Sequence, residues 1–324
     1  MPFSIRHFHQ DGLSLVSLKD ENSGSEAVLL PGYGAALHAF KVATAVPQHN
    51  GAGEMFNVVD NYTSLEQVKN EMGVNFKGPK LSPFPCRIAD ATYRFAGAEY
   101  RFEKTFFDGT AIHGLLFDKS FAVTDEVAGK TSASVILQHR YNKENAAYPF
   151  IYDCAVKYIL HPENLLEVQT IVTNLDKTTI PIADGWHPYF RLGGKIDDWL
   201  LRFNSEMIVD FDEHLIPTGH LMKYDDFCEE RRIGSTQLDN CFVLGTSKTG
   251  PACELSNPST GLRISLFPDS GYPYLQIYTP PDRQTIAIEN LSAAPDCFNN
   301  KMGLILLPPG HSQTFTVNYK VSVR

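Results

Sequence analysis

Features that would place this chain of 324 residues in several common protein classes are missing. Its six cysteines are scattered, with no C-x-x-C pair. The opening residues MPFSIRHFHQDGLSL contain no hydrophobic leader, so we expect a cytoplasmic protein whose thiols stay free in a reducing compartment. No apolar run approaches the roughly 20 residues that span a bilayer, so we expect no membrane-spanning segment.

Positive charge is also in short supply. The chain has 28 Lys and Arg against 37 Asp and Glu, which gives a formal net charge of -9. Phosphate backbones and anionic membrane surfaces attract basic patches, so neither nucleic acid nor a membrane is an expected partner. With 43% hydrophobic and 20% charged residues, the composition is that of a globular protein with a substantial core.

Motifs for cofactor-dependent chemistry are absent as well. The sequence has no G-x-G-x-x-G after a strand, no Walker loop, no H-E-x-x-H and no G-x-S-x-G elbow. His7 and His9 form an H-x-H pair without an acidic or cysteine partner, which is a weak signal for a metal site. We therefore expect proton-transfer chemistry with no metal and no other cofactor.

Short segments typical of β-strands dominate what is present. They are rich in β-branched and aromatic residues, and clusters of Pro, Gly, Asn and Asp separate them. They lie at residues 91–107 (a hairpin), 132–141, 150–160, 165–175, 262–268, 274–279, 285–291 and 313–323. No linker, repeat or change in composition marks a boundary. The sequence therefore predicts one all-β domain over residues 1–324, a large antiparallel β-sandwich.

One helix is predicted. Thr63-Ser64-Leu65-Glu66 has the pattern of a capping box, and Gly73 is expected to end the helix.

The stretch ADGWHPYFRLGG, residues 183–194, places one histidine among aromatic residues. The unperturbed pKa of histidine allows proton exchange near neutral pH, so His187 is a candidate acid or base. Trp186, Tyr189 and Phe190 beside it could form a stacking surface for a ligand. A lone histidine among aromatics can equally be a core residue.

Glu289 lies in the apolar strand segment TIAIENL. Strand alternation places it on the face opposite Ile286 and Ile288. It is therefore either a solvated carboxylate at the edge of a sheet or a general base in a partly desolvated cleft.

Three further polar residues stand near the ends of strand-like segments. His113 is followed by Gly114, which could let the chain turn so that the imidazole projects into a concave face. Arg87 follows a stiff, Pro-rich loop and could pair with a ligand hydroxyl or a carboxylate. Asp239 precedes an apolar run and could simply start a strand.

The segments that contain these residues resemble, in the same order, blocks of the aldose 1-epimerase (galactose mutarotase) family. The family's Asn-Arg-Ile segment and hairpin are similar to LSPFPCRIADATYRFAGAEYRF, and its His-Gly segment is similar to AIHGLLFDKSF. The block of its catalytic histidine resembles GWHPYFRL. Its Pro-x-Gly loop and sugar-binding aspartate resemble LIPTGHLMKYDDFCEERRIGSTQLDNCFVL, and the block of its catalytic glutamate resembles AIENLSAAPDCFNN.

This resemblance implies a large β-sandwich with a sugar lying across one concave sheet. It implies an enzyme that interconverts the α and β anomers of a free hexose, with Glu289 as general base and His187 as general acid. We expect the two side chains to face one cleft with room between them for a pyranose ring. The partner would be a small-molecule aldose, and the protein a monomer or weak homodimer.

The resemblance also implies the residues that bind the sugar. Its hydroxyls would be bound by Arg87, His113 and Asp239, and its apolar face by Trp186 or Tyr189. The chain departs from the family at Cys86, which stands where an Asn precedes the arginine. A thiol lacks the donor and acceptor pair of an amide, so the recognition of at least one hydroxyl must differ.

Two alternatives remain open. A hexose-6-phosphate epimerase of the same superfamily would need a basic phosphate clamp, for which Arg231, Arg232 and Arg283 are candidates. A non-catalytic sugar-binding or regulatory protein could use the same fold. The acidic composition speaks against the first, and the presence of both His187 and Glu289 speaks against the second.

Overall fold

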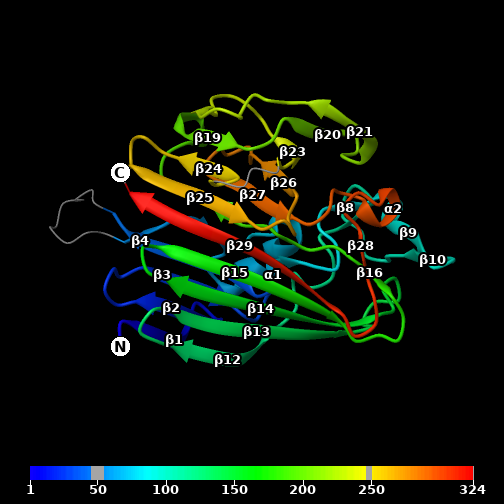
Figure 1. Ribbon diagram of the computed structural model, residues 1–324, viewed down its shortest axis with the longest axis horizontal. Coiled ribbons are helices and arrows are strands. Elements are labelled where there is room, and N and C mark those ends of the chain that lie inside the picture. Colours follow the sequence, from blue (N-terminus) through cyan, green and yellow to red (C-terminus); the bar gives the residue numbers. More distant parts are fainter. Residues whose placement is uncertain (45–54, 246–249, 324) are drawn as a thin grey trace.

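Antiparallel β-sheets dominate the computed structural model, which describes residues 1–44, 55–245 and 250–323 (Figure 1). The predicted antiparallel β-sandwich is confirmed. Its two largest sheets have nine strands each, and a five-stranded sheet is formed by the amino-terminal residues. Within the described residues, no helix has the length and apolar character needed to cross a membrane. All six cysteines are free thiols, as expected.

The first large sheet contains the longest strands, among them β29, the last strand of the described chain. In spatial order it consists of β12 (Ala122–Ala128), β13 (Ala133–Asn142), β14 (Ile151–His161), β15 (Leu165–Asn174), β29 (Ser312–Val323), β25 (Leu262–Pro268), β24 (Cys253–Ser256), β19 (Leu200–Phe203) and β22 (Arg231–Arg232). Figure 1 shows β29 in red between green β15 and gold β25. Along β14 and β15 every second residue is buried, as expected for strands with one face on the core.

The second large sheet carries the predicted catalytic residues. It consists of β21 (Pro217–Lys223), β20 (Met207–Phe211), β23 (Asp239–Val243), β26 (Tyr274–Tyr278), β27 (Ile286–Leu291), β17 (Gly185–Trp186) and β7 (Lys80–Leu81), while β18 (Tyr189–Phe190) pairs with β27 and with β6 (Val59–Asp60). Every residue of β27 is buried. One hydrophobic core joins the two large sheets, for example through Val156 of the first and Ile288 of the second.

The amino-terminal sheet was not predicted from the sequence. It consists of β1 (Phe3–Gln10), β2 (Leu13–Asp20), β3 (Glu26–Leu30), β4 (Ala36–Ala43) and β5 (Met55–Asn57). Most residues of β2 and β3 are buried on both faces, so these strands lack the alternation by which half-buried strands are recognised.

Short paired strands complete the described part of the chain. They are β8 (Arg87–Ile88) with β11 (Ala111–Ile112), β9 (Thr92–Phe95) with β10 (Ala98–Arg101), and β16 (Ile180–Ile182) with β28 (Ile305–Leu307). The second of these pairs is the predicted hairpin, and it turns at Ala96 and Gly97. A short helix, α2 (Cys297–Asn300), and the 3-10 turns at Ala89–Ala91 and Ile196–Asp198 lie in the connections.

The predicted helix is α1 (Leu65–Asn75), and both of its predicted ends need correction. Its cap is Ser64, one residue later than the Thr63 of the predicted capping box, because the Ser64 hydroxyl accepts the Gln67 N–H at 3.2 Å. The helix also continues through Gly73. It ends at Asn75, and the C-cap residue Phe76 has a left-handed backbone (φ 48°), donates its N–H to the Met72 carbonyl at 3.1 Å and has a buried ring.

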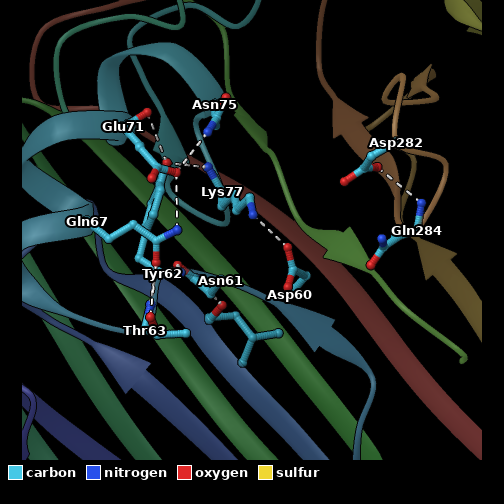
Figure 2. Close-up of polar contacts among 11 residues, drawn as sticks. Asp60, Asn61, Tyr62, Thr63, Gln67, Glu71, Asn75, Lys77, Asp282 and Gln284 are labelled. Carbon is cyan, nitrogen blue, oxygen red and sulfur yellow. Dashed lines mark hydrogen bonds and ion pairs between the residues drawn. The ribbon is translucent and has the colours of Figure 1, made fainter.

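A polar network fixes the end of α1 against the sheet (Figure 2). The Tyr62 hydroxyl accepts the Lys77 N–H at 3.1 Å, and the Lys77 ammonium lies 2.7 Å from the Asp60 carboxylate on β6. The Glu71 carboxylate accepts from the side-chain amides of Gln67 and Asn75. This network holds the last turn of α1 in place, and that turn forms one wall of the cleft described next.

Candidate active site

A cleft of about 300 Å³ is lined by residues of the second large sheet. Its other walls come from the end of α1, from β8 and β11, and from the turn between β20 and β21. Six of the predicted site residues line it, namely Arg87, His113, His187, Tyr189, Asp239 and Glu289. A neighbouring cavity of about 210 Å³ shares Phe76, Phe106 and Ile112 with the cleft but contains none of the predicted site residues.

His187 and Glu289 are direct cross-strand neighbours. Gly185 pairs with Leu291 and Tyr189 pairs with Ala287, so the register places His187 opposite Glu289. The imidazole Nε2 lies 3.3 Å from the carboxylate Oε1. The expectation of room for a pyranose ring between them is therefore wrong, because paired strands bring facing side chains into contact.

Burial shifts the pKa values of this pair in opposite directions. The His187 and Glu289 side chains are 7% and 2% exposed. Burial lowers the pKa of His187 to about 4. Burial raises the pKa of Glu289 well above its ordinary value, the carboxylate of Asp239 raises it further, and Arg87 opposes the rise. Both shifts favour the uncharged form of each group, a neutral imidazole beside a protonated carboxyl.

His113 reaches the cleft through a sharp turn, as its sequence context predicted. Both His113 (φ 57°) and Gly114 (φ 74°) have left-handed backbones. A side chain at Gly114 would put its Cβ 2.3 Å from the carbonyl oxygen of Ser82, so only glycine fits here. The Cys86 N–H donates to His113 Nδ1 at 3.2 Å, which leaves the proton of a neutral ring on Nε2.

The His113 imidazole is held in its neutral form. Its pKa lies well below the ordinary value, chiefly because the ring is buried and also because of His187 and Arg87. Its Nε2–H is therefore a donor for a ligand oxygen. Donor atoms of Cys86, His113 and Glu289 lie within 4.8 Å of one another, a set that could also hold a transition metal ion. The expectation that the protein uses no metal stays a prediction.

Arg87 on β8 pairs with a carboxylate, Asp108, that the sequence analysis did not single out. Its Nε donates to Asp108 Oδ2 at 2.9 Å. Asp108 also accepts the N–H and hydroxyl of Thr110, which fixes the turn that carries it. The guanidinium is therefore oriented in the cleft wall. The Asp-Gly of FFDGT indicates a turn in the sequence, but nothing in that segment indicates that Asp108 pairs with Arg87.

Asp239 was expected either to start a strand or to bind the sugar. It is the first residue of β23, and it also lines the cleft. Its Oδ1 accepts the side-chain N–H of Gln276 at 2.9 Å. Burial raises the pKa of Asp239, while Arg87 and Gln276 oppose the rise. Gln276 lies directly across from Glu289 in the β26–β27 pair, and sequence reasoning missed it. A polar residue in the middle of the apolar segment YLQIY was the available signal.

Tyr189 lines the cleft, whereas Trp186 does not. The Tyr189 ring stacks on His187, with centroids 5.1 Å apart and planes at 17°. Strand alternation turns Trp186 to the opposite face, where its ring packs against the buried Lys80 ammonium at 4.1 Å. The prediction that Trp186 binds the sugar is therefore wrong. Phe190 also faces the core, against Tyr319.

Phe76 is a second cleft residue that sequence reasoning missed. Its ring lies 4.6 Å from the His113 ring and 6.5 Å from the His187 ring, measured between centroids. The end of α1 thus packs against both histidines. Altogether the cleft brings an acid–base pair, a neutral imidazole donor, a guanidinium and a carboxylate around one space, which suits proton transfer on a ligand rich in hydroxyls.

Comparison with known proteins decides the family. The model of the aldose 1-epimerase family matches residues 14–320. The chain belongs to the aldose 1-epimerase family. The uncharacterised protein YihR of Escherichia coli (strain K12) is 29% identical over 247 residues, which cover 74% of this chain and 77% of YihR. The bifunctional protein GAL10 of Kluyveromyces lactis is 24% identical over 245 residues, which cover 68% of this chain and 34% of GAL10.

Solved structures share the fold over the full length. A galactose mutarotase-like protein from Clostridium acetobutylicum has a TM-score of 0.85 and 19% identity, and the match covers 100% of this chain and 99% of that one. Galactose 1-epimerase from Lactobacillus acidophilus NCFM has a TM-score of 0.80 and 19% identity, with 99% and 98% covered. At this identity the match establishes the galactose mutarotase-like β-sandwich and no more.

Proposed function

We propose that this member of the aldose 1-epimerase family is a mutarotase that interconverts the α and β anomers of a free hexose in the cleft described above. The observation that carries the proposal is the contact of His187 Nε2 with Glu289 Oε1 at 3.3 Å on the cleft floor. A carboxyl and an imidazole in contact can accept a proton from one oxygen and donate a proton to another when both oxygens are bonded to the same carbon.

The reaction needs two proton transfers at neighbouring oxygens. Ring opening breaks the C1–O5 bond and forms the C1=O1 double bond, while O1 loses a proton and O5 gains one. Rotation about C1–C2 then presents the other carbonyl face, and the reverse steps close the ring as the other anomer. Because O1 and O5 are both bonded to C1, an acid and a base in contact with each other can serve both oxygens.

The acid and the base exchange roles between ring opening and ring closure. The family resemblance gives Glu289 the role of base towards O1–H and His187 the role of acid towards O5, and ring closure exchanges the two roles. Hydroxyls that donate to Glu289 stabilise its carboxylate form, so a bound sugar moves the shared proton towards His187. Each positioned acid or base contributes about 10²- to 10⁴-fold in rate.

The remaining cleft residues hold the ring. Arg87, His113, Asp239 and Tyr189 all line the cleft, which supports hydroxyl binding by the first three and stacking of the sugar's C–H surface on the ring of Tyr189. The Cys86 side chain also lines the cleft, so one hydroxyl meets a thiol where the family's usual residue offers an amide.

The positions of the candidate phosphate ligands favour a free sugar over a hexose 6-phosphate. Arg231, Arg232 and Arg283 all lie outside the cleft lining. Each is paired with a carboxylate: the partners are Asp226, Asp198 and Asp197 respectively. These arginines are therefore not available as a clamp for a phosphate on a sugar bound in this cleft.

The test is an anomerisation assay on freshly dissolved α-glucose, α-galactose and α-glucose 6-phosphate, followed by polarimetry or NMR. We expect kcat/KM for a free hexose to exceed that for glucose 6-phosphate at least tenfold, a difference of about 1.4 kcal/mol in transition-state stabilisation. The reverse preference would favour the phosphate-specific alternative. Binding of the sugars without any acceleration would show a non-catalytic sugar-binding protein.

A further inference from the structure

Few backbone contacts hold the segment that carries His187. In the described part of the chain, β17 pairs with β27 only at Gly185 and Leu291. Pro188, which follows His187, has no N–H to donate to the sheet. A slip of one residue in this pairing would turn His187 to the other face of the sheet, away from Glu289. The contact between the acid and the base therefore depends on whatever fixes the register.

Asp184 supplies a further pair in the same register. It lies three residues before His187, and Ser292 lies three residues after Glu289. The Asp184 N–H donates to Ser292 Oγ at 2.8 Å, and the Ser292 N–H donates to the Asp184 carbonyl at 2.8 Å. These two hydrogen bonds extend the β17–β27 pairing by one position. They hold this end of the pairing in the register that places His187 opposite Glu289.

The Asp184 carboxylate is held in turn by a buried lysine. Lys80 Nζ lies 2.5 Å from Asp184 Oδ1, and both side chains are 0% exposed. The Tyr272 hydroxyl donates to the same oxygen at 2.7 Å. Lys80 lies on β7, where it pairs with Trp186 on the side of β17 away from β27. Its ammonium also donates to the Thr170 hydroxyl on β15 at 3.2 Å. The Lys80–Asp184 contact thus joins the start of β17 to its neighbouring strand and to the first large sheet.

This ion pair costs stability and does not touch the cleft. A buried pair of charges loses its hydration, and apolar residues of similar volume are often as stable or more stable in its place. Asp184 Oδ2 adds to the cost, since this buried oxygen has no hydrogen-bond partner in the part of the chain that the structure describes. Neither Lys80 nor Asp184 lines the cleft, because strand alternation turns Asp184 to the face opposite His187. What such a pair can provide is a specified register.

We propose that the Lys80–Asp184 pair and Ser292 fix the strand register of the acid–base pair. On the function proposed above, on which this inference rests for its kinetic consequence, they are positioning residues for the epimerase reaction. A displacement of about 1 Å can lower a rate by about 10²-fold. Sugar-binding residues such as Arg87 on β8 and Asp239 on β23 lie on other strands. A shift of β17 should therefore lower kcat and leave the affinity for the sugar in place.

The experiment replaces the ion pair by apolar residues of similar size, Lys80→Met with Asp184→Leu. Calorimetry counts the sugar-binding sites, and kcat is expressed per site, so that a partly unfolded sample does not register as a slow enzyme. We expect kcat per site to fall at least about tenfold while the Kd for the sugar stays within about threefold of wild type. In urea the double variant should unfold at a higher midpoint than Lys80→Met alone, which leaves a buried carboxylate without its cation.

A second variant and a control accompany the double variant. Ser292→Ala removes the acceptor of the Asp184 N–H without changing any charge, and it should lower kcat per site by a smaller factor. Lys41→Met with Glu26→Leu makes the same kind of replacement at a cross-strand ion pair of 2.9 Å in the amino-terminal sheet. Neither of these two residues lines the cleft, so kcat per site should stay at the wild-type value.

A crystal structure of the double variant tests the register without reference to activity. We expect His187 Nε2 and Glu289 Oε1 to lie farther apart than the 3.3 Å of the wild-type chain. An unchanged contact would overturn this inference, and so would a kcat per site within about twofold of wild type in a folded double variant. If the double variant does not fold, Ser292→Ala decides, and an unchanged kcat per site in it would overturn the inference. No acceleration of anomerisation by the wild-type protein would overturn the proposed function, and the distance in the double variant would then decide the register alone.

Discussion

His187, in the link between β17 and β18, faces Glu289 on β27, and this register brings the two groups into contact as an acid–base pair. Gly185–Leu291 and Tyr189–Ala287 are the pairs on either side. The position of each group therefore depends on the same strand pairing. Burial lowers the pKa of the imidazole and raises that of the carboxyl, so burial favours the uncharged form of both groups.

The first prediction concerns the loss of either member of this unit. Glu289→Gln keeps the size of the side chain and its ability to bind a hydroxyl, but the amide cannot take up a proton at neutral pH. We expect kcat to fall at least about 10²-fold while sugar affinity is largely kept. His187→Asn should behave in the same way. Anomer-exchange rates by NMR and calorimetric binding of the same sugar give the two quantities.

The double variant tests whether the two groups act together. Residues that act as a unit are not additive, so Glu289→Gln with His187→Asn should lose much less than the product of the two single losses. Near-wild-type exchange in Glu289→Gln would mean that another residue is the base. Full multiplicative losses would mean that the two groups act in independent steps.

Several strands of the large sheets, such as β13, β14 and β15, could be predicted because they carry local signals, whereas others, such as β12, β20 and β21, were not predicted. β14 and β15 alternate between buried and partly exposed residues, and turn residues bound them. The amino-terminal strands lack that alternation since β2 and β3 are buried on both faces. The end of α1 was misplaced because Gly73 is a local signal, whereas the helix is capped at Phe76, which is not a glycine and whose ring is buried by tertiary packing.

Most residues of the site could be predicted from the sequence, but the distances between them could not. Family resemblance pointed to cleft residues such as His187 and Glu289, but the distance between them depends on a strand register that no local pattern encodes. Trp186 was predicted to face the cleft because it directly precedes His187 in the sequence. Strand alternation places adjacent residues on opposite faces, so Trp186 lies on the other face. Asp108 and Gln276 act through partners distant in sequence, Arg87 and Asp239, so only the folded chain reveals them.

The second prediction is a bell-shaped pH dependence of kcat/KM. As the pH falls through the lowered pKa of His187, about 4, the imidazole takes up a second proton and the pair has no base left. As the pH rises through the raised pKa of Glu289, the pair loses its only proton and has no acid left. Activity should therefore be retained between these limits and fall on both sides.

Asp239 sets the position of the alkaline limb. Its negative charge helps to raise the pKa of Glu289. Asp239→Asn removes that charge and lowers the Glu289 pKa, so the alkaline limb should move to lower pH. Asp125→Asn, on the distant edge strand β12, removes a charge of the same sign and should leave the limb in place. If the alkaline limb of the kcat/KM profile moves to higher pH in Asp239→Asn, the assignment of that limb to Glu289 is contradicted.

The last prediction concerns the turn that places His113. Gly114 has φ 74°, and a Cβ there would lie 2.3 Å from the Ser82 carbonyl oxygen. Gly97, at the tip of the β9–β10 hairpin, has φ 80° with nothing within 4 Å of an added Cβ. Gly97→Ala should therefore cost only the left-handed backbone strain, about 1 kcal/mol of the free energy of unfolding. Gly114→Ala bears the same strain together with a backbone clash.

We expect Gly114→Ala to lower the free energy of unfolding by at least about 2 kcal/mol more than Gly97→Ala, measured by urea denaturation. The clash moves the Ser82–Gly114 contact, and His113 precedes Gly114 directly, so KM for the sugar should rise in the variant that still folds. Gly97→Ala should keep the wild-type KM. Equal stability losses in the two variants would show that the turn yields to a side chain and does not fix the imidazole.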